Sequence, residues 1–222
     1  MTPEEKNIIV RCQEGDLSLN LYNDKLYTDD INGDIKISAK YSDLKTTLAG
    51  KVIIDSYEGP FEIDNCINME ITSKYTDFEN KNVKDILLKE IYEGSIESQK
   101  INSLTISKSK YVNYKLGILD KSIRLDDSYE DDFFIDKLGY GFRSLELNGK
   151  YLKCETRFNN NLDLKFLANI KYPHLELENV DLTTKIKIKE SSTLEYEAYK
   201  GEISDNMPLI SLSGSEIRFT FK

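Results

Sequence analysis

Residues 35–44 read IKISAKYSDL, and residues 69–78 read MEITSKYTDF. In both stretches, apolar side chains precede a tyrosine by six and four positions, and a spacing of two places them on one face of a β-strand. The same setting recurs at separations of 16 (57 − 41 = 16) to 22 residues (151 − 129 = 22), at Tyr41, Tyr57, Tyr75, Tyr92, Tyr111, Tyr129, Tyr151 and Tyr172. The chain is therefore predicted to be a repeat protein of about ten units, each a strand, a bend at the tyrosine, a second strand and a turn.

The units alternate between two types. One type reads Lys-Tyr-x-(Asp/Asn), as in KYSD at 40–43, KYTD at 74–77 and KYVN at 110–113. The other reads Tyr-Glu-(Gly/Asp), as in YEG at 57–59, YEG at 92–94 and YED at 129–131. The full period over this stretch is therefore two units.

Two all-β architectures fit this pattern. In a parallel β-helix, or solenoid, each unit of 16–22 residues is one coil, and equivalent residues stack about 4.8 Å apart. In a long antiparallel meander or two-layer sheet, odd and even units run in opposite directions, which would explain the two types. The short unit and its internal bend favour the β-helix. Residues 84–92, KDILLKEIY, have helical propensity but match the repeat, so they too are predicted to be a strand.

The whole chain, 1–222, is interpreted as one domain. Residues 17–182 carry the repeat units, while 1–16, which include Pro3-Glu4-Glu5, are expected to cap one end. Residues 183–222 are expected to form plain strands or a cap, because a repeat array needs atypical ends that cover its core and block edge pairing.

Composition excludes several classes of partner. With 30 basic and 39 acidic residues, the net charge of −9 disfavours nucleic acid and anionic lipid, which both need a basic surface. No apolar run approaches the roughly 20 residues that span a bilayer. Residues 1–13 show no signal peptide, so the protein is expected in the cytoplasm, or in the envelope if a leader was removed before Met1. Cys12, Cys66 and Cys154 form no metal-binding motif and are expected to be buried thiols, although one disulfide remains open.

Units such as Ile35–Leu44, Met69–Phe78 and Leu104–Tyr114 resemble the adhesin repeat proteins of the Gram-negative bacterial envelope, which carry KYSD-type repeats. The resemblance covers roughly residues 33–180. It implies a right-handed β-helix and an envelope or surface location, and it implies no catalytic residues.

The tyrosines are the first candidate site. On a β-helix, residues one coil apart stack, so the column is flanked by Lys40, Lys74 and Lys110. Such a column can bind sugars, because amphipathic rings recognise amphipathic ligands, or it can simply be packing at a bend. The candidate binding residues are Tyr41, Tyr57, Tyr75, Tyr92, Tyr111 and Tyr129.

An acidic cluster is the second candidate site. Its carboxylates are hard oxygen ligands that suit Ca²⁺, although no EF-hand loop is present and such a run is commonly a solvated face. The candidate calcium ligands are Asp126, Asp127, Glu130, Asp131 and Asp132. No other cofactor is expected, and His174 is the only histidine, so a catalytic triad or a histidine-rich metal site is not predicted.

The sequence therefore favours a non-enzymatic, adhesin-like repeat protein that presents a surface for a glycan or another protein. The alternative is a cytoplasmic β-helical scaffold that associates end to end. A polysaccharide-acting enzyme on a β-helix is the third hypothesis, and the absence of clustered Arg, Lys and Asp residues in repeat register argues against it.

Overall fold

The computed structural model describes residues 6–11, 13–157, 162–177 and 180–222; Cys12 and Pro3-Glu4-Glu5 lie outside the described residues. The described chain is all-β and has no helix. The first nine strands are β1 (Lys6–Val10), β2 (Gln13–Glu14), β3 (Leu17–Tyr22), β4 (Asp24–Asn32), β5 (Ile35–Lys40), β6 (Asp43–Ile106), β7 (Ser109–Leu125), β8 (Ser128–Tyr129) and β9 (Asp132–Leu138). The remaining strands are β10 (Ser144–Lys150), β11 (Lys153–Thr156), β12 (Leu164–Lys171), β13 (His174–Leu177), β14 (Thr183–Glu190), β15 (Thr193–Lys200), β16 (Leu209–Ser215) and β17 (Arg218–Phe221).

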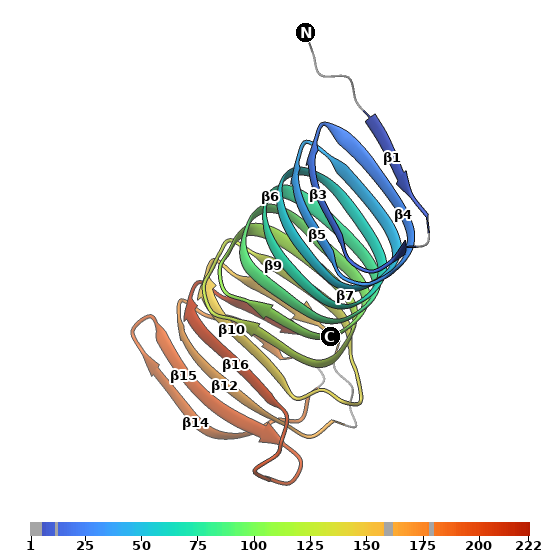
Figure 1. Cartoon of the computed structure of the whole chain (residues 1–222). Coiled ribbons are helices and arrows are strands. Elements are labelled where there is room, and N and C mark those ends of the chain that lie inside the picture. Colours follow the sequence, from blue (N-terminus) through green and yellow to red (C-terminus); the bar gives the residue numbers. More distant parts are fainter. Residues whose placement is uncertain (1–5, 12, 158–161, 178–179) are drawn as a thin grey trace.

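The strands wind into a parallel β-solenoid (Figure 1). Apart from β14 and β15, each strand pairs in parallel with the strand one coil away, as in Ile37 opposite Ile54 and Ile91 opposite Ser109. The parallel prediction is therefore confirmed, and the antiparallel meander is not the fold. The solenoid has about eight turns, somewhat fewer than the ten units expected, and residues 183–200 form a hairpin that is not a coil.

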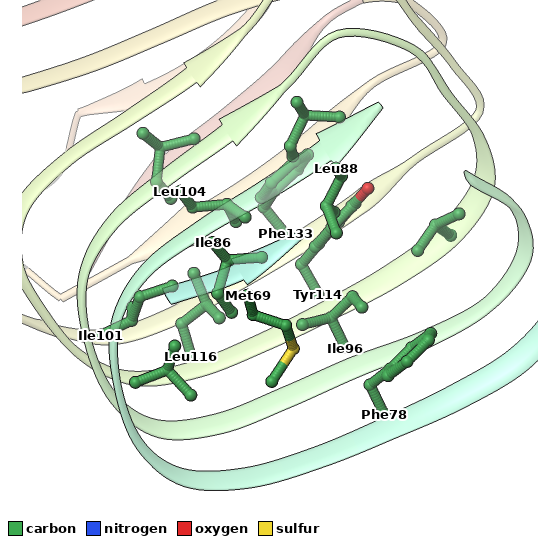
Figure 2. Packing of buried hydrophobic residues seen from close by; sticks show 14 of the residues in the cluster. Met69, Phe78, Ile86, Leu88, Ile96, Ile101, Leu104, Tyr114, Leu116 and Phe133 are labelled. Atoms are coloured by element: carbon green, nitrogen blue, oxygen red, sulfur yellow. The ribbon is translucent and has the colours of Figure 1, made fainter. Parts of the chain in front are cut away.

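Period-two alternation fills the interior of the solenoid. In β5, Ile35, Ile37 and Ala39 are buried while the residues between them are exposed. Equivalent side chains stack along the axis, and Figure 2 shows Met69, Ile86 and Leu104 among the residues that converge on the interior from successive coils. Segment 84–92 lies within β6 as predicted, because burial in the stack overrides its helical propensity.

A sharp bend on one side of each coil takes a left-handed residue with φ between 48° and 60°. The tyrosine itself is left-handed in the Lys-Tyr units, whereas in the Tyr-Glu units it is the following glutamate. We call this position the corner and the residue before it the strand end. In spatial order the corner residues are Asn23, Tyr41, Glu58, Tyr75, Glu93, Tyr111, Glu130, Tyr151, Glu216 and Tyr172. The two unit types are thus two ways of turning the same bend.

Two of the three Tyr-Glu units, those at 57–59 and 92–94, need glycine immediately after the corner. Gly94 has a φ of +136°, and a Cβ there would lie 2.1 Å from the Thr76 carbonyl oxygen of the neighbouring coil. Gly59 makes an equally close approach to Ser42. Only glycine has no Cβ to clash there, which explains why YEG recurs at this position.

The order of coils in space departs from the order of the sequence. Strand β16 pairs in parallel with β10 on one side and with β12 on the other. Strand β17 likewise lies between β11 and β13. The C-terminal residues 209–221 therefore form a coil inserted between the coils of 144–156 and 164–177 (Figure 1). We call it the inserted coil.

Residues 183–222, expected as strands or a cap, thus divide into two structures. The antiparallel hairpin β14–β15 lies against β12, at the end of the molecule (Figure 1). The inserted coil instead lies inside the stack, where Ile210, Phe219 and Phe221 are fully buried. At the other end, β1 and β3 each pair on one side only among the described residues.

Candidate functional site

Tyrosine rings form a continuous ladder along the corner edge of the solenoid. Successive rings meet edge to face, with centroids 5.4–5.9 Å apart and interplanar angles of 70–90°. This geometry is favourable for aromatic pairs because the positive edge of one ring meets the negative face of the next. The ladder contains the six predicted residues with one more at each end: Tyr22, Tyr41, Tyr57, Tyr75, Tyr92, Tyr111, Tyr129 and Tyr151.

The ladder zigzags between two adjacent columns. Tyr57 occupies the strand end, opposite Lys40, whereas Tyr41 occupies the corner. Along the ladder from Tyr22 to Tyr151, the strand end is lysine where it is not tyrosine, and the corner is usually glutamate where it is not tyrosine. Tyrosine, lysine and glutamate thus form a regular, nearly charge-balanced strip along the corner edge.

One lysine of the strip contacts three of the rings directly. The Lys110 ammonium lies 5.8, 4.7 and 5.0 Å from the ring centroids of Tyr92, Tyr111 and Tyr129, which are cation–π distances. A hydrogen bond with Glu93, followed by burial, raises the pKa of Tyr92. The rings remain accessible, since Tyr75 is 42% and Tyr41 is 47% exposed. The strip therefore offers aromatic edges, cations and carboxylates together to a ligand.

No family model, curated protein or solved structure matches the chain. In the part of the chain that the structure describes, no helix is long and apolar enough to cross a membrane.

The five carboxylates of the acidic cluster do not converge. Asp126 accepts a hydrogen bond from the Arg124 guanidinium, at 2.8 Å. Asp131 points inward and is fully buried, whereas Asp127, Glu130 and Asp132 are exposed. Among the described residues, no group of three or more His, Cys, Asp or Glu side chains is arranged to hold a metal ion.

Asp131 belongs to a buried polar network. Its carboxylate accepts hydrogen bonds from the backbone N–H of Val112, at 2.8 Å, and from the Ser128 hydroxyl, at 2.6 Å. Nearby, the Ser109 and Tyr114 hydroxyls lie 2.6 Å apart. Burial raises the pKa of Asp131, although these hydrogen bonds to the carboxylate oppose the shift. Asp131 follows the corner in the last Tyr-Glu unit, where the earlier units have glycine.

The remaining predicted features are structural. Cys66 and Cys154 are buried free thiols, and burial raises the pKa of Cys66 to about 12. His174 begins β13 on the surface, with its Nε2 2.6 Å from Glu176. The thiols are therefore not activated nucleophiles.

Sequence reasoning missed the inserted coil and the surface that it creates. A signal was present: Tyr151 and Tyr172 both belong to Lys-Tyr units, so the two-unit alternation fails between them. In space Glu216 lies between these two corners and restores the alternation. Tyr151 donates its backbone N–H to Ser215, and Glu216 donates its own to Lys171.

Proposed function

We propose that this protein is a non-enzymatic, adhesin-like repeat protein whose corner strip binds a saccharide. The single observation that supports this is the unbroken ladder from Tyr22 to Tyr151, accessible along its length and interleaved with lysine and glutamate. Aromatic surfaces with nearby polar groups suit sugar rings, whose faces are apolar and whose edges carry hydroxyls. A repeating strip with a period of one coil suits a polymer with repeating units.

Binding of the protein to an array of immobilised saccharides tests this proposal. Tyr57→Ala and Tyr92→Ala remove strand-end rings without touching a left-handed residue, and each should weaken binding to the saccharides that the parent protein retains. Tyr140→Ala is the matched control, because Tyr140 is 89% exposed and lies outside the ladder. Equal binding by Tyr57→Ala and the parent, or no retained saccharide, would contradict the proposal.

We propose the cell envelope as the location, in line with the resemblance of the KYSD-type units to envelope repeat proteins. Fractionation of native cells, with mass spectrometry of the protein's N-terminus, tests this. A processed N-terminus in the envelope fraction is the expected result. A chain that starts at Met1 or Thr2 in the cytosol would contradict it.

A scaffold that associates end to end is the second candidate function. It is favoured by edge strands that pair on one side only in the described chain, namely β1 and β3 at one end and β13 at the other. Strand β14 argues against end-to-end association, since charged side chains such as Lys185, Lys187 and Lys189 protect the edge of a sheet from pairing with another chain. Sedimentation velocity at rising protein concentration distinguishes the two: filaments would favour the scaffold, and a constant small species would favour the binding protein.

A further inference from the structure

The tyrosine ladder stops where the inserted coil begins. The ladder alternates between corner and strand end from coil to coil. The ring after Tyr151, the next rung of the ladder, is therefore expected at the strand end of the inserted coil. That residue is Ser215, which lies opposite Lys150 on one side and Lys171 on the other. The next corner ring is Tyr172, one coil further on. One rung of the ladder is therefore missing between two tyrosines that lie two coils apart.

A cleft of about 350 Å³ lies at this gap. Tyr151 and Tyr172 stand at its two sides, and Glu216 lies between them at the corner of the inserted coil. The negative charge of Glu216 is the main cause of the raised pKa of Tyr151. The Lys171 ammonium lies 5.3 Å from the centroid of the Tyr172 ring. The cleft thus has aromatic walls and a carboxylate held at its centre.

Basic side chains line the other part of the cleft. Lys153 on β11, Arg218 on β17 and His174 on β13 are direct neighbours across three adjacent strands. All three are exposed and contribute to the cleft. His174 is held by Glu176, which also accepts a hydrogen bond from Thr220. Neither Lys153 nor Arg218 forms an ion pair with an acidic residue of the described chain.

Several outward lysines of the solenoid form an ion pair with an acid one coil away, as Lys81 does with Asp64 at 2.7 Å and Lys100 with Asp120 at 2.8 Å. Lys153 lies opposite Asp132 on β9 but forms no such ion pair with it, and on its other side it lies opposite Arg218. Like charges opposite one another on neighbouring strands are unfavourable. Lys153 beside Arg218 is such a pair in a protein of net charge −9, and an anionic group bound between them would relieve the repulsion.

We propose that this cleft binds an acidic sugar residue, of the uronic acid class, within a saccharide chain. The carboxylate lies between Lys153 and Arg218, and the sugar ring lies against Tyr172 in the space of the missing rung. Glu216 accepts a hydrogen bond from a ring hydroxyl. The inference rests on the proposed saccharide-binding function and adds to it a site that selects for negative charge.

Ser215→Tyr tests the proposal by filling the gap. The new ring can contact Tyr151 and Tyr172 as Tyr129 contacts Tyr111 and Tyr151, at 5.8 and 5.4 Å, so the fold should be retained. Binding of tetragalacturonate is measured by titration calorimetry, beside its carboxyl-reduced form. Ser215→Tyr should weaken binding of tetragalacturonate by about tenfold or more. Ser215→Ala, which leaves the gap open, should bind as the parent does.

Arg218→Gln tests the charge. It should weaken binding of tetragalacturonate and leave binding of the carboxyl-reduced form unchanged, and the parent's preference for the acidic form should fall as salt screens the charges. If Ser215→Tyr binds tetragalacturonate as well as the parent while Tyr57→Ala binds it less well, the cleft is not the site and the strip proposal stands. If no acidic saccharide binds the parent, the cleft proposal fails. Retained neutral saccharides on the array would still support the strip.

Discussion

At the residue scale, the unusual feature is a bulky side chain in a left-handed conformation, repeated from coil to coil. Tyr41, Tyr75, Tyr111, Tyr151 and Tyr172 all adopt it. L-residues lose roughly 1–2 kcal/mol in this region, whereas asparagine tolerates it. At Tyr41, Tyr75 and Tyr111, edge-to-face contacts with rings on both sides each contribute about 0.5–1.5 kcal/mol beyond burial, which offsets the backbone cost. Asn23 occupies the same corner in the first coil and shows that the bend itself does not need a ring.

Two substitutions at Tyr75 separate the backbone cost from the ring contacts. Both Tyr75→Ala and Tyr75→Asn lose the contacts with Tyr57 and Tyr92 and should lower the free energy of unfolding. Tyr75→Asn should be the more stable of the two by about 1 kcal/mol, because asparagine relieves the left-handed strain. Urea denaturation followed by circular dichroism measures both. Equal stability of the two variants would show that the corner is not strained.

At the element scale, the corner of each coil is completed by the residue that follows it. Glycine fills this place in two Tyr-Glu units because a Cβ there would lie only 2.1 Å from a carbonyl oxygen of the neighbouring coil. In the unit of β8 and β9, Asp131 takes the place and uses its carboxylate to bind the backbone N–H of Val112. The bend is thus preserved by a buried hydrogen bond that involves an ionisable group.

Asp131→Asn should make the protein more stable at neutral pH. The raised pKa of Asp131 means that folding favours the protonated form, so the parent loses stability as pH rises through the folded-state pKa, above the ordinary 3.8. Asparagine retains an oxygen for Val112 and avoids the buried charge. The advantage should shrink as pH falls toward 3.8, as measured by thermal melts from pH 3 to pH 8. An advantage that does not change with pH would contradict this account, and Asp131→Ala, which leaves Val112 unsatisfied, should be destabilised throughout.

At the scale of the whole molecule, the inserted coil makes the C-terminus part of the interior. In most solenoids each repeat contacts only its neighbours in sequence, so a terminal repeat can be lost without harm to the middle. Here β12 pairs with β16 and β15, and its pairing partners do not include β10. The coil of 164–177 therefore depends on residues 209–221 for its place in the stack.

Truncation after Pro208 should consequently unfold residues that it does not remove, namely those of the coil of 164–177. Without the inserted coil, direct stacking of the coils of 144–156 and 164–177 would place Lys150 against Lys171 and Tyr151 against Tyr172. These two coils should therefore not come together to replace the pairing that is lost. In hydrogen exchange, amides of 164–177 should lose protection while those of 35–106 keep it. Ile188→Ala is the control, because Ile188 is 46% exposed on the hairpin and should leave both regions protected. Retained protection of 164–177 after truncation would contradict the dependence.

Much of the fold could be predicted from local pattern. Period-two burial around each tyrosine, a unit of 16–22 residues and turn residues between the units were enough to predict parallel coils, because each coil is specified by its own residues. The tyrosine column could also be predicted, since equal spacing in a solenoid places equivalent residues in contact. The inward direction of Asp131 could not, because it depends on the neighbouring backbone N–H of Val112.

The coils, the stacking tyrosines and the two types of unit can all be derived from the amino-acid sequence. All three follow from alternation and backbone conformation over a few residues. Only the tertiary structure decided the order of the last coils, the missing rung at Ser215 and the cleft beside Lys153 and Arg218. Those features arise from pairing between residues far apart in the sequence, such as Asn148 and Ser213, which are 65 positions apart, and no local pattern specifies which of several similar strands will be the partner.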